Sequence, residues 1–272
     1  MTRQQLVYQI QKKQSCLCIG LDPDLEKMPA FLRQSAEHPV LAFHRAIIEA
    51  TAPYCVAYKL NTAFYEVMGA EGWQLLEQTL KWIPDSHLKI ADAKRNDVGH
   101  TAQQYARTFF HTFGFDAVTV SPWLGKDSVE PFLAYPGKWT ILLGLTSNPG
   151  SKDFLQLPYS DGYLYEYLMK QAAGWASADQ LMFVVGATWP DQLQQLRKQF
   201  PDHFFLVPGV GAQGGDLSTI MQIGQGSTDA ALLINVSRAI LYASPDQDFA
   251  EAAAQKARLY AREMAAYLHH KS

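Results

Sequence analysis

The stretch His87–Asp97 reads HLKIADAKRND. Its apolar first half predicts a short strand over residues 87–92, and a helix is predicted at about 100–112. Five of the six residues from Asp92 to Asp97 are polar or charged, directly where the apolar strand ends. Because side chains alternate along a strand, Asp92 and Lys94 are expected on one face. Charges at such a position are tolerated only where they are paired with opposite charges or serve binding or catalysis. This stretch therefore predicts the centre of an active site.

The strand and helix of residues 87–112 form a unit that recurs along the chain. Further apolar strands are predicted at 16–21, 55–61, 117–121, 139–146, 181–186, 203–207 and 230–236. Helices are predicted at 3–13, 39–53, 70–82, 127–134, 161–175 and 190–199, and a last helix is expected to start with Ser244 and Pro245. Continuously apolar strands indicate a parallel sheet that is buried on both faces.

Eight such units without a break in composition predict an α/β protein with a single closed (β/α)8 TIM barrel. We expect this barrel to be one domain over residues 1–272. An open, doubly wound sheet is the alternative architecture.

The composition of the chain excludes several classes of protein. Hydrophobic residues make up 48% of the 272 residues and the net charge is -3, so no strong field attracts nucleic acid or a membrane surface. Neither a membrane-spanning apolar run nor a secretory signal is visible, so a cytoplasmic protein is expected. Cys16, Cys18 and Cys55 suit core packing better than a disulfide framework. Without Cys or His pairs at ligand spacing, no metal site is expected.

Polar residues fall where the predicted strands end, which is the face of a barrel that carries the chemistry. These candidates are Asp22, Lys59, Asp92, Lys94, Asp97, Ser121, Thr146, Ser147, Ser237, Arg238 and the loop PGVGAQGGD at 208–216. A glycine-rich loop and an arginine after the last two strands are typical of barrel phosphate sites. The sequence therefore predicts a ligand with a phosphate at one end and a charged cluster at the other.

The loop also fits the pattern G-x-G-x-x-G through Gly209, Gly211 and Gly214. A dinucleotide fold would place this pattern at the first strand–helix turn and an acidic residue at the end of the next strand. Here the pattern comes late and Asp229 precedes its strand, so a mobile lid with Gln213 reaching a ligand is favoured.

Each candidate also has a purely structural interpretation. Asp22 suits a turn, Lys59 could extend to solvent, Arg238 could cap a loop, and Asp97 favours a helix N-terminus. Ser147 and Thr101 are ordinary cap residues as well. Their joint placement at one end of a predicted barrel favours a functional site.

The pattern Asp92-x-Lys94-Arg95-x-Asp97-Val98-x-x-Thr101-Ala102 resembles the signature of the orotidine 5′-phosphate decarboxylase family in its longer bacterial form. The similarity extends to Asp22, to Lys59 within Tyr58-Lys59-Leu60-Asn61, to the loop at 208–216 and to Ser237-Arg238. It therefore spans most of the chain.

This resemblance implies a homodimeric barrel that converts orotidine 5′-monophosphate to uridine 5′-monophosphate and CO2 in pyrimidine biosynthesis. No metal or cofactor is implied. Lys94 would donate a proton to C6 of the pyrimidine, within an array formed with Lys59, Asp92 and Asp97. Asp97 and Thr101 would reach into the partner subunit's site.

The resemblance also implies the substrate contacts. Asp22 would bind a ribose hydroxyl and Ser147 the pyrimidine, while Gln213 and Arg238 would hold the phosphate. Ser237 stands where many relatives have glycine, so only its backbone N–H is expected to contact the substrate. Val98 stands where isoleucine is commoner.

Two other functions remain open. Sugar-phosphate relatives such as keto-gulonate-phosphate decarboxylase or hexulose-phosphate synthase share Asp-x-Lys but use Mg²⁺. A non-catalytic barrel that binds a phosphorylated ligand belongs to a different class, although such a protein has no need of an internal proton donor.

Overall fold

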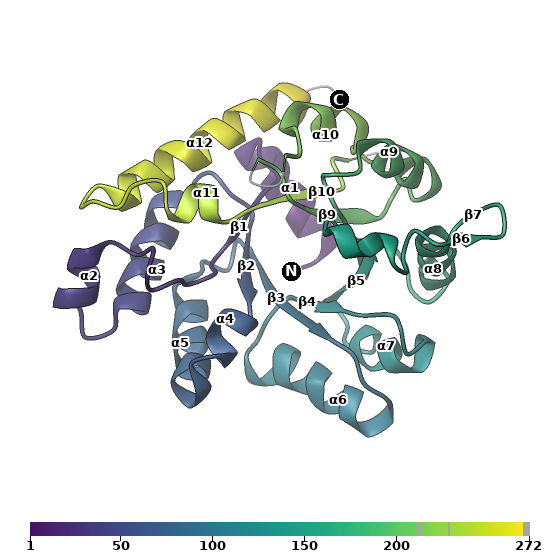
Figure 1. Ribbon diagram of the computed structural model, residues 1–272, viewed down its shortest axis with the longest axis horizontal. Helices are drawn as coiled ribbons and strands as arrows, with labels where there is room; N and C mark the ends of the chain where they lie inside the picture. Colours follow the sequence, from purple (N-terminus) through teal and green to yellow (C-terminus); the bar gives the residue numbers. More distant parts are fainter. Residues whose placement is uncertain (212–213, 228, 269–272) are drawn as a thin grey trace.

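The computed structural model describes residues 1–211, 214–227 and 229–268, and its strands form a closed barrel (Figure 1). The order around the barrel is β1-β10-β9-β8-β5-β4-β3-β2, and every neighbouring pair is parallel. The barrel strands are β1 Leu17–Gly20, β2 Ala57–Asn61, β3 Leu88–Arg95, β4 Ala117–Val120, β5 Trp139–Leu145, β8 Leu181–Val185, β9 Phe204–Pro208 and β10 Leu232–Val236.

Helices surround the strands as an outer ring, with α12 lying across one side of the barrel (Figure 1). The longer helices are α1 Arg3–Lys13, α3 Pro39–Thr51, α5 Gly69–Trp82, α6 Gly99–Arg107, α7 Lys126–Leu133, α8 Leu164–Ala173, α9 Pro190–Gln199 and α12 Phe249–Leu268. Shorter helical segments are α2 Ala30–Ser35, α4 Ala63–Glu66, a π-helical turn Thr108–Thr112, a 3-10 turn Pro149–Lys152, α10 Leu217–Ile223 and α11 Arg238–Leu241. None of the described helices combines the length and apolar character of a membrane span.

The predicted (β/α)8 barrel is confirmed, and the open-sheet alternative is wrong. Strand β1 pairs with β2 on one side and with β10 on the other, so the sheet has no free edge there. The glycine pattern at 209–214 accordingly follows the seventh barrel strand, β9, and not the first strand of a dinucleotide fold.

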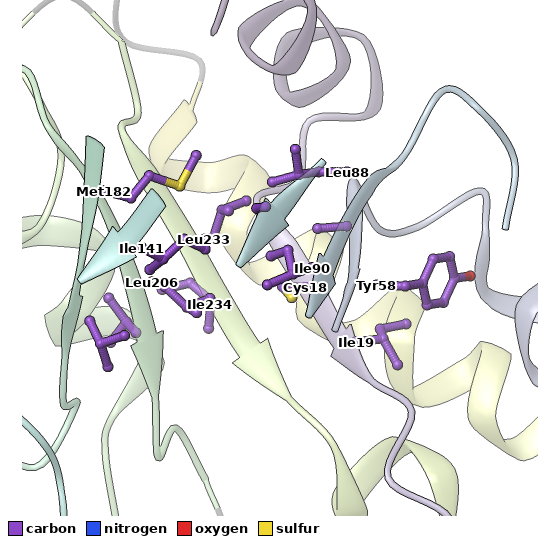
Figure 2. Close-up of a cluster of buried hydrophobic side chains, with 14 of the residues drawn as sticks. Cys18, Ile19, Tyr58, Leu88, Ile90, Ile141, Met182, Leu206, Leu233 and Ile234 are labelled. Atoms are coloured by element: carbon purple, nitrogen blue, oxygen red, sulfur yellow. The ribbon is translucent and has the colours of Figure 1, made fainter. Parts of the chain in front are cut away.

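Apolar side chains from most of the barrel strands meet in the core, as Figure 2 shows for Cys18, Ile90, Ile141, Met182 and Leu233. All three cysteines are free and buried, as their apolar context predicts. Outward-facing residues pack against the helices. Tyr58, for example, lies with its hydroxyl 2.8 Å from Thr51 Oγ1 of α3.

Besides the short helices α2, α4, α10 and α11, which were not predicted, three local features differ from the predicted elements. Strand β3 runs on to Arg95 instead of ending at residue 92. The long connection 147–180 contains a hairpin, β6 Pro158–Tyr159 and β7 Gly162–Tyr163, which projects from the barrel (Figure 1). The last helix begins at Phe249 and not after Ser244, whose hydroxyl accepts the Asp246 N–H in a turn before the helix.

Arg197 joins the loops that lead into β9 and β10. Its guanidinium donates to the carbonyls of Gly224 at 2.7 Å, His203 at 2.7 Å and Ala231 at 2.9 Å. It also lies 3.8 Å from the centre of the Phe205 ring. The side chain is buried, so it satisfies carbonyls that have little access to water. The Ala231 carbonyl also accepts the Phe205 N–H.

Replacing Arg197 with methionine keeps much of the apolar stem but removes every one of these donors. We expect Arg197→Met to lower the free energy of unfolding by about 3 kcal/mol or more, because several buried carbonyls lose their partners. Urea denaturation measures this change. The exposed Arg258 on α12 gives the control, and Arg258→Met should stay within about 0.5 kcal/mol. Equal stability of the two variants would contradict the assigned role.

Candidate active site

Two adjoining cavities open at the carboxyl ends of the barrel strands. The charged cavity, of about 230 Å³, is lined by Lys59, Asp92, Lys94, Thr119, Leu143, Thr146, Ser147, Asn148, Val184, Leu206, Pro208 and Asn235. The arginine cavity, of about 370 Å³, is lined by residues that include Asp22, Asn61, Gly209, Ser237 and Arg238. Pro208 and Asn235 line both cavities, so one elongated ligand can occupy the two together.

A carboxylate between two lysines forms the floor of the charged cavity. Lys59 Nζ donates to Asp92 Oδ2 at 2.8 Å, and Lys94 Nζ donates to Asp92 Oδ1 at 2.6 Å. Lys59 comes from β2 and the other two from β3, and the parallel register sets Asn61 opposite Asp92. Lys59 and Asp92 are largely buried, whereas the Lys94 side chain is 50% exposed and its ammonium can meet a ligand.

The charges in this cluster stabilise one another. Burial opposes the charged form of Lys59, but the carboxylates of Asp92 and Asp22 outweigh it and raise the pKa of Lys59 above its ordinary value. Burial likewise opposes ionised Asp92, yet Lys59 and Lys94 together hold the pKa of Asp92 well below its usual range. Both groups therefore stay charged at neutral pH.

The contact between Lys94 and Asp92 depends on an irregularity of strand β3, and regular alternation of side chains does not account for it. The register between β3 and β4 shifts between Ala91 and Arg95, which marks a bulge. Lys94 itself has φ +49°, in the left-handed region that few residues other than glycine adopt. The side chains of Asp92 and Lys94 lie on the same side of β3, as predicted. It is the bulge, and not regular alternation, that brings them into contact.

Asp22 connects the two cavities. Its Oδ1 lies 3.9 Å from Lys59 Nζ and accepts the Asn61 N–H at 3.3 Å, while its Oδ2 accepts the Ser237 hydroxyl at 2.8 Å. Gly20 permits this approach, because a Cβ there would lie 2.8 Å from Ser237 Cβ. The side chain of Ser237 is thus turned toward β1.

The arginine cavity ends at Arg238, an exposed residue at the start of α11. The glycine-rich loop borders the same cavity through Gly209, which has φ +98°. The loop turns back on itself, since Gly215 donates its N–H to Gly209 O at 3.2 Å. Gln213, which was predicted to bind phosphate, lies outside the described residues.

The remaining predicted residues fall in different places. Ser147 follows β5 and lines the charged cavity. Asp97 and Thr101 are not among the described residues that line either cavity: Asp97 accepts the N–H of Val98 at 2.8 Å, and Thr101 is exposed on α6. Within a single chain, therefore, Lys59, Asp92 and Lys94 come together with Asp22, but Asp97 does not join them.

The structure adds lining residues that the sequence did not single out. Thr119 of β4 and Asn235 of β10 both contribute to the cavity walls. Each is a polar residue inside an otherwise apolar strand, which is the signal that could have identified them. Across the described residues, no group of three or more His, Cys, Asp or Glu side chains could hold a metal ion.

Fold and site together define a class: a (β/α)8 barrel with a lysine–aspartate–lysine cluster beside a second cavity that contains an arginine. A family model described as orotidine 5′-phosphate decarboxylase / HUMPS family matches residues 15–253. The chain belongs to this family, and the resemblance noted in its sequence is confirmed.

Individual relatives agree with this assignment. A protein from Parabacteroides distasonis named orotidine 5′-phosphate decarboxylase is 50% identical over 276 residues, covering 100% of this chain and 98% of its own. The structure of an OMP decarboxylase from Leishmania donovani is similar, with a TM-score of 0.81, 35% identity, and coverage of 96% of this chain and 100% of that one. A UMP synthase from the same organism gives a TM-score of 0.83 at 37% identity over 96% of this chain, which spans only 57% of that protein.

The buried Lys59–Asp92 pair can be tested by its effect on stability. Lys59→Met leaves the carboxylates of Asp92 and Asp22 facing each other without their shared cation. We therefore expect the free energy of unfolding to fall by about 3 kcal/mol or more. Asp92→Asn in the same chain should recover part of the loss, which a double-mutant cycle with urea denaturation measures.

The exposed pair Lys81–Glu77, at 3.3 Å, is the matched control. Its cycle with Lys81→Met and Glu77→Gln should give a coupling within about 0.5 kcal/mol. A Lys59–Asp92 coupling as small as this surface value would show that the buried pair does not organise the site.

Proposed function

We propose that this protein decarboxylates orotidine 5′-monophosphate to uridine 5′-monophosphate and CO2, the closing reaction of uridine monophosphate biosynthesis. The observation that carries the proposal is the half-exposed ammonium of Lys94, fixed by Asp92 in a cavity that adjoins a second cavity ending at Arg238. Family membership and full-length relatives that bear this enzyme's name support it.

The difficulty of the reaction lies at C6 of the pyrimidine. When the bond from C6 to the carboxylate breaks, the electron pair stays on C6 in the plane of the ring, where no π-system can spread the charge. Lys94 places a cation beside this carbon and then transfers a proton from Nζ to it. The lysine regains its proton from water. Stabilisation is thus directed to the atom where charge develops.

Asp92 and Lys59 prepare Lys94 for this step. Because its pKa is held low, Asp92 remains ionised, and its Oδ1 accepts the hydrogen bond that orients the Lys94 ammonium. Lys59 occupies the second carboxylate oxygen and so fixes the plane of the Asp92 carboxylate. Bound substrate also brings its own carboxylate close to Asp92, and loss of CO2 relieves that repulsion.

The arginine cavity binds the other end of the nucleotide. Arg238 and the loop at 208–216, with Gln213, hold the phosphate, Asp22 binds a ribose hydroxyl, and Ser147 contacts the pyrimidine. Ser237 contributes its backbone N–H, since its hydroxyl is engaged by Asp22. Binding energy from the remote phosphate then closes the site over the reacting ring. No metal or cofactor takes part in this scheme.

We further propose that the protein is a homodimer in which Asp97 and Thr101 complete the partner subunit's site. Exposed apolar side chains support an interface, because Val98, which follows Asp97 in the chain, and Trp123, Leu124 and Phe154 are each at least 50% exposed. Asp97 would then approach Lys94 of the other subunit. The same proposal treats residues 1–272 as one domain and the enzyme as cytoplasmic.

The activity is tested by following ultraviolet absorbance with orotidine 5′-monophosphate in the presence of EDTA. Wild-type protein should turn the substrate over, whereas Lys94→Ala should lose about 4 kcal/mol or more of transition-state stabilisation, roughly 10³-fold in kcat. The exposed Lys256 on α12 supplies the control variant, Lys256→Ala, which should match wild type.

Other outcomes of this assay point to the remaining functions. Turnover abolished by EDTA and restored by Mg²⁺ would indicate a metal-dependent sugar-phosphate enzyme. Tight binding of uridine 5′-monophosphate without turnover would indicate a binding protein. Near-native turnover in Lys94→Ala would remove Lys94 from the chemistry.

Crossing of Asp97 between subunits is tested by co-expressing Lys94→Ala and Asp97→Ala chains. Each homodimer lacks one essential group in both sites, but a mixed dimer contains one site with both groups intact. Random pairing should therefore restore up to about a quarter of wild-type turnover per subunit, given two-fold symmetry. Mixed dimers as inactive as either parent would place Asp97 in its own chain's site.

A further inference from the structure

The bulge that carries Asp92 and Lys94 is opposed by a single residue of the neighbouring strand. The ladder between β3 and β4 pairs Ile90 with Ala117 and Ala91 with Val118, and then resumes only at Arg95 and Val120. Three residues of β3, from Asp92 to Lys94, therefore face Thr119 alone. Ordinary strand pairing leaves this segment without a full set of backbone partners.

The hydroxyl of Thr119 supplies the missing contacts. Its Oγ1 accepts the backbone N–H of Lys94 at 2.9 Å and donates to Asp92 Oδ1 at 3.1 Å. Thr119 itself is only 1% exposed, at the wall of the charged cavity. A threonine hydroxyl offers one donor and two acceptor positions, and here it uses both functions on residues of the proposed catalytic cluster.

We propose that Thr119 is a positioning residue, whose hydroxyl closes the β3 bulge and thereby fixes Lys94 and Asp92 relative to the reacting carbon. The inference rests on the proposed function of the Lys94 ammonium. It assigns to β4 a role in the chemistry that neither the strand-end pattern nor the family signature includes.

Two features make Lys94 dependent on this hydroxyl. Its side chain is half exposed, so packing does not hold the ammonium in place. Its backbone has φ +49°, an unfavourable conformation that persists only where neighbouring contacts enforce it. The bond from Lys94 N to Thr119 is such a contact, and without it the residue is free to relax.

Asp92 depends on Thr119 for its orientation as well. Lys59 holds Oδ2, while Oδ1 receives both the Lys94 ammonium and the Thr119 hydroxyl. The hydroxyl comes from the rigid barrel wall, whereas Lys94 is the group to be positioned. Because misplacing a reacting group by about 1 Å can cost about 10²-fold in rate, small rotations of Asp92 matter for turnover.

The test compares Thr119→Val, which keeps the shape but removes the hydroxyl, with Thr119→Ser, which keeps the hydroxyl. We expect Thr119→Val to lower kcat at least about 10-fold while the Kd for uridine 5′-monophosphate changes less than about 3-fold. Thr119→Ser should retain kcat within about 3-fold. This split between turnover and binding, with rescue by serine, distinguishes positioning from a general structural role.

Thr140 of β5 supplies a matched control, since it is buried and its Oγ1 has no hydrogen-bond partner among the described residues. Thr140→Val should leave kcat unchanged. A second measurement is hydrogen exchange at the Lys94 amide in wild type, Thr119→Ser and Thr119→Val. Loss of the bond should speed exchange in the valine variant alone, whatever the activity.

Several results would overturn the inference. One is a Thr119→Val enzyme with wild-type kcat. Another is an equal loss of kcat in Thr119→Val and Thr119→Ser. The third is equal protection of the Lys94 amide from exchange in these two variants. If Thr119→Val does not fold, Thr119→Cys takes its place: its weaker hydrogen bonding should give a kcat below that of serine, and equality would refute the role. Absence of turnover in wild type would instead refute the proposed function.

Discussion

The shared carboxylate of Asp92 is the interaction on which the site depends. Taking three charges into the mouth of a barrel is costly, and the cost is met only because each oxygen of Asp92 receives a lysine ammonium. The cluster therefore holds a cation in a fixed position, so little reorganisation is needed when negative charge develops nearby.

The barrel supplies this arrangement through the register of its first strands. Lys59 lies opposite Ile90 on β3 and Gly20 on β1. The first of these neighbours has an apolar side chain, and the second has no side chain. The ammonium can then extend past Gly20 toward Asp22 and across to Asp92. Parallel strands bring their carboxyl ends to one rim, which is why charges far apart in the sequence gather there.

The architecture and much of the site could be predicted because they follow from local patterns. Continuous apolar runs located the eight barrel strands, and polar residues at or after their carboxyl ends located Asp22, Lys59, Asp92 and Lys94. The bulge at Lys94 could not be predicted, since it involves a register shift and a hydrogen bond to a residue of another strand. Thr119 was not singled out because it lies inside its strand and not at the strand end, and the hairpin β6–β7 is too short for a periodic signal.

The contact between Asp22 and Ser237 has a consequence for how the enzyme is made. These residues are 215 positions apart, yet their hydrogen bond joins the first barrel strand to the segment after the last. A nascent chain emerging from the ribosome therefore lacks one wall of the arginine cavity until the segment after β10 has been synthesised. Long-range closure of this kind raises contact order and slows folding. The two cavities are thus completed only after the eighth barrel strand has emerged and paired with the first.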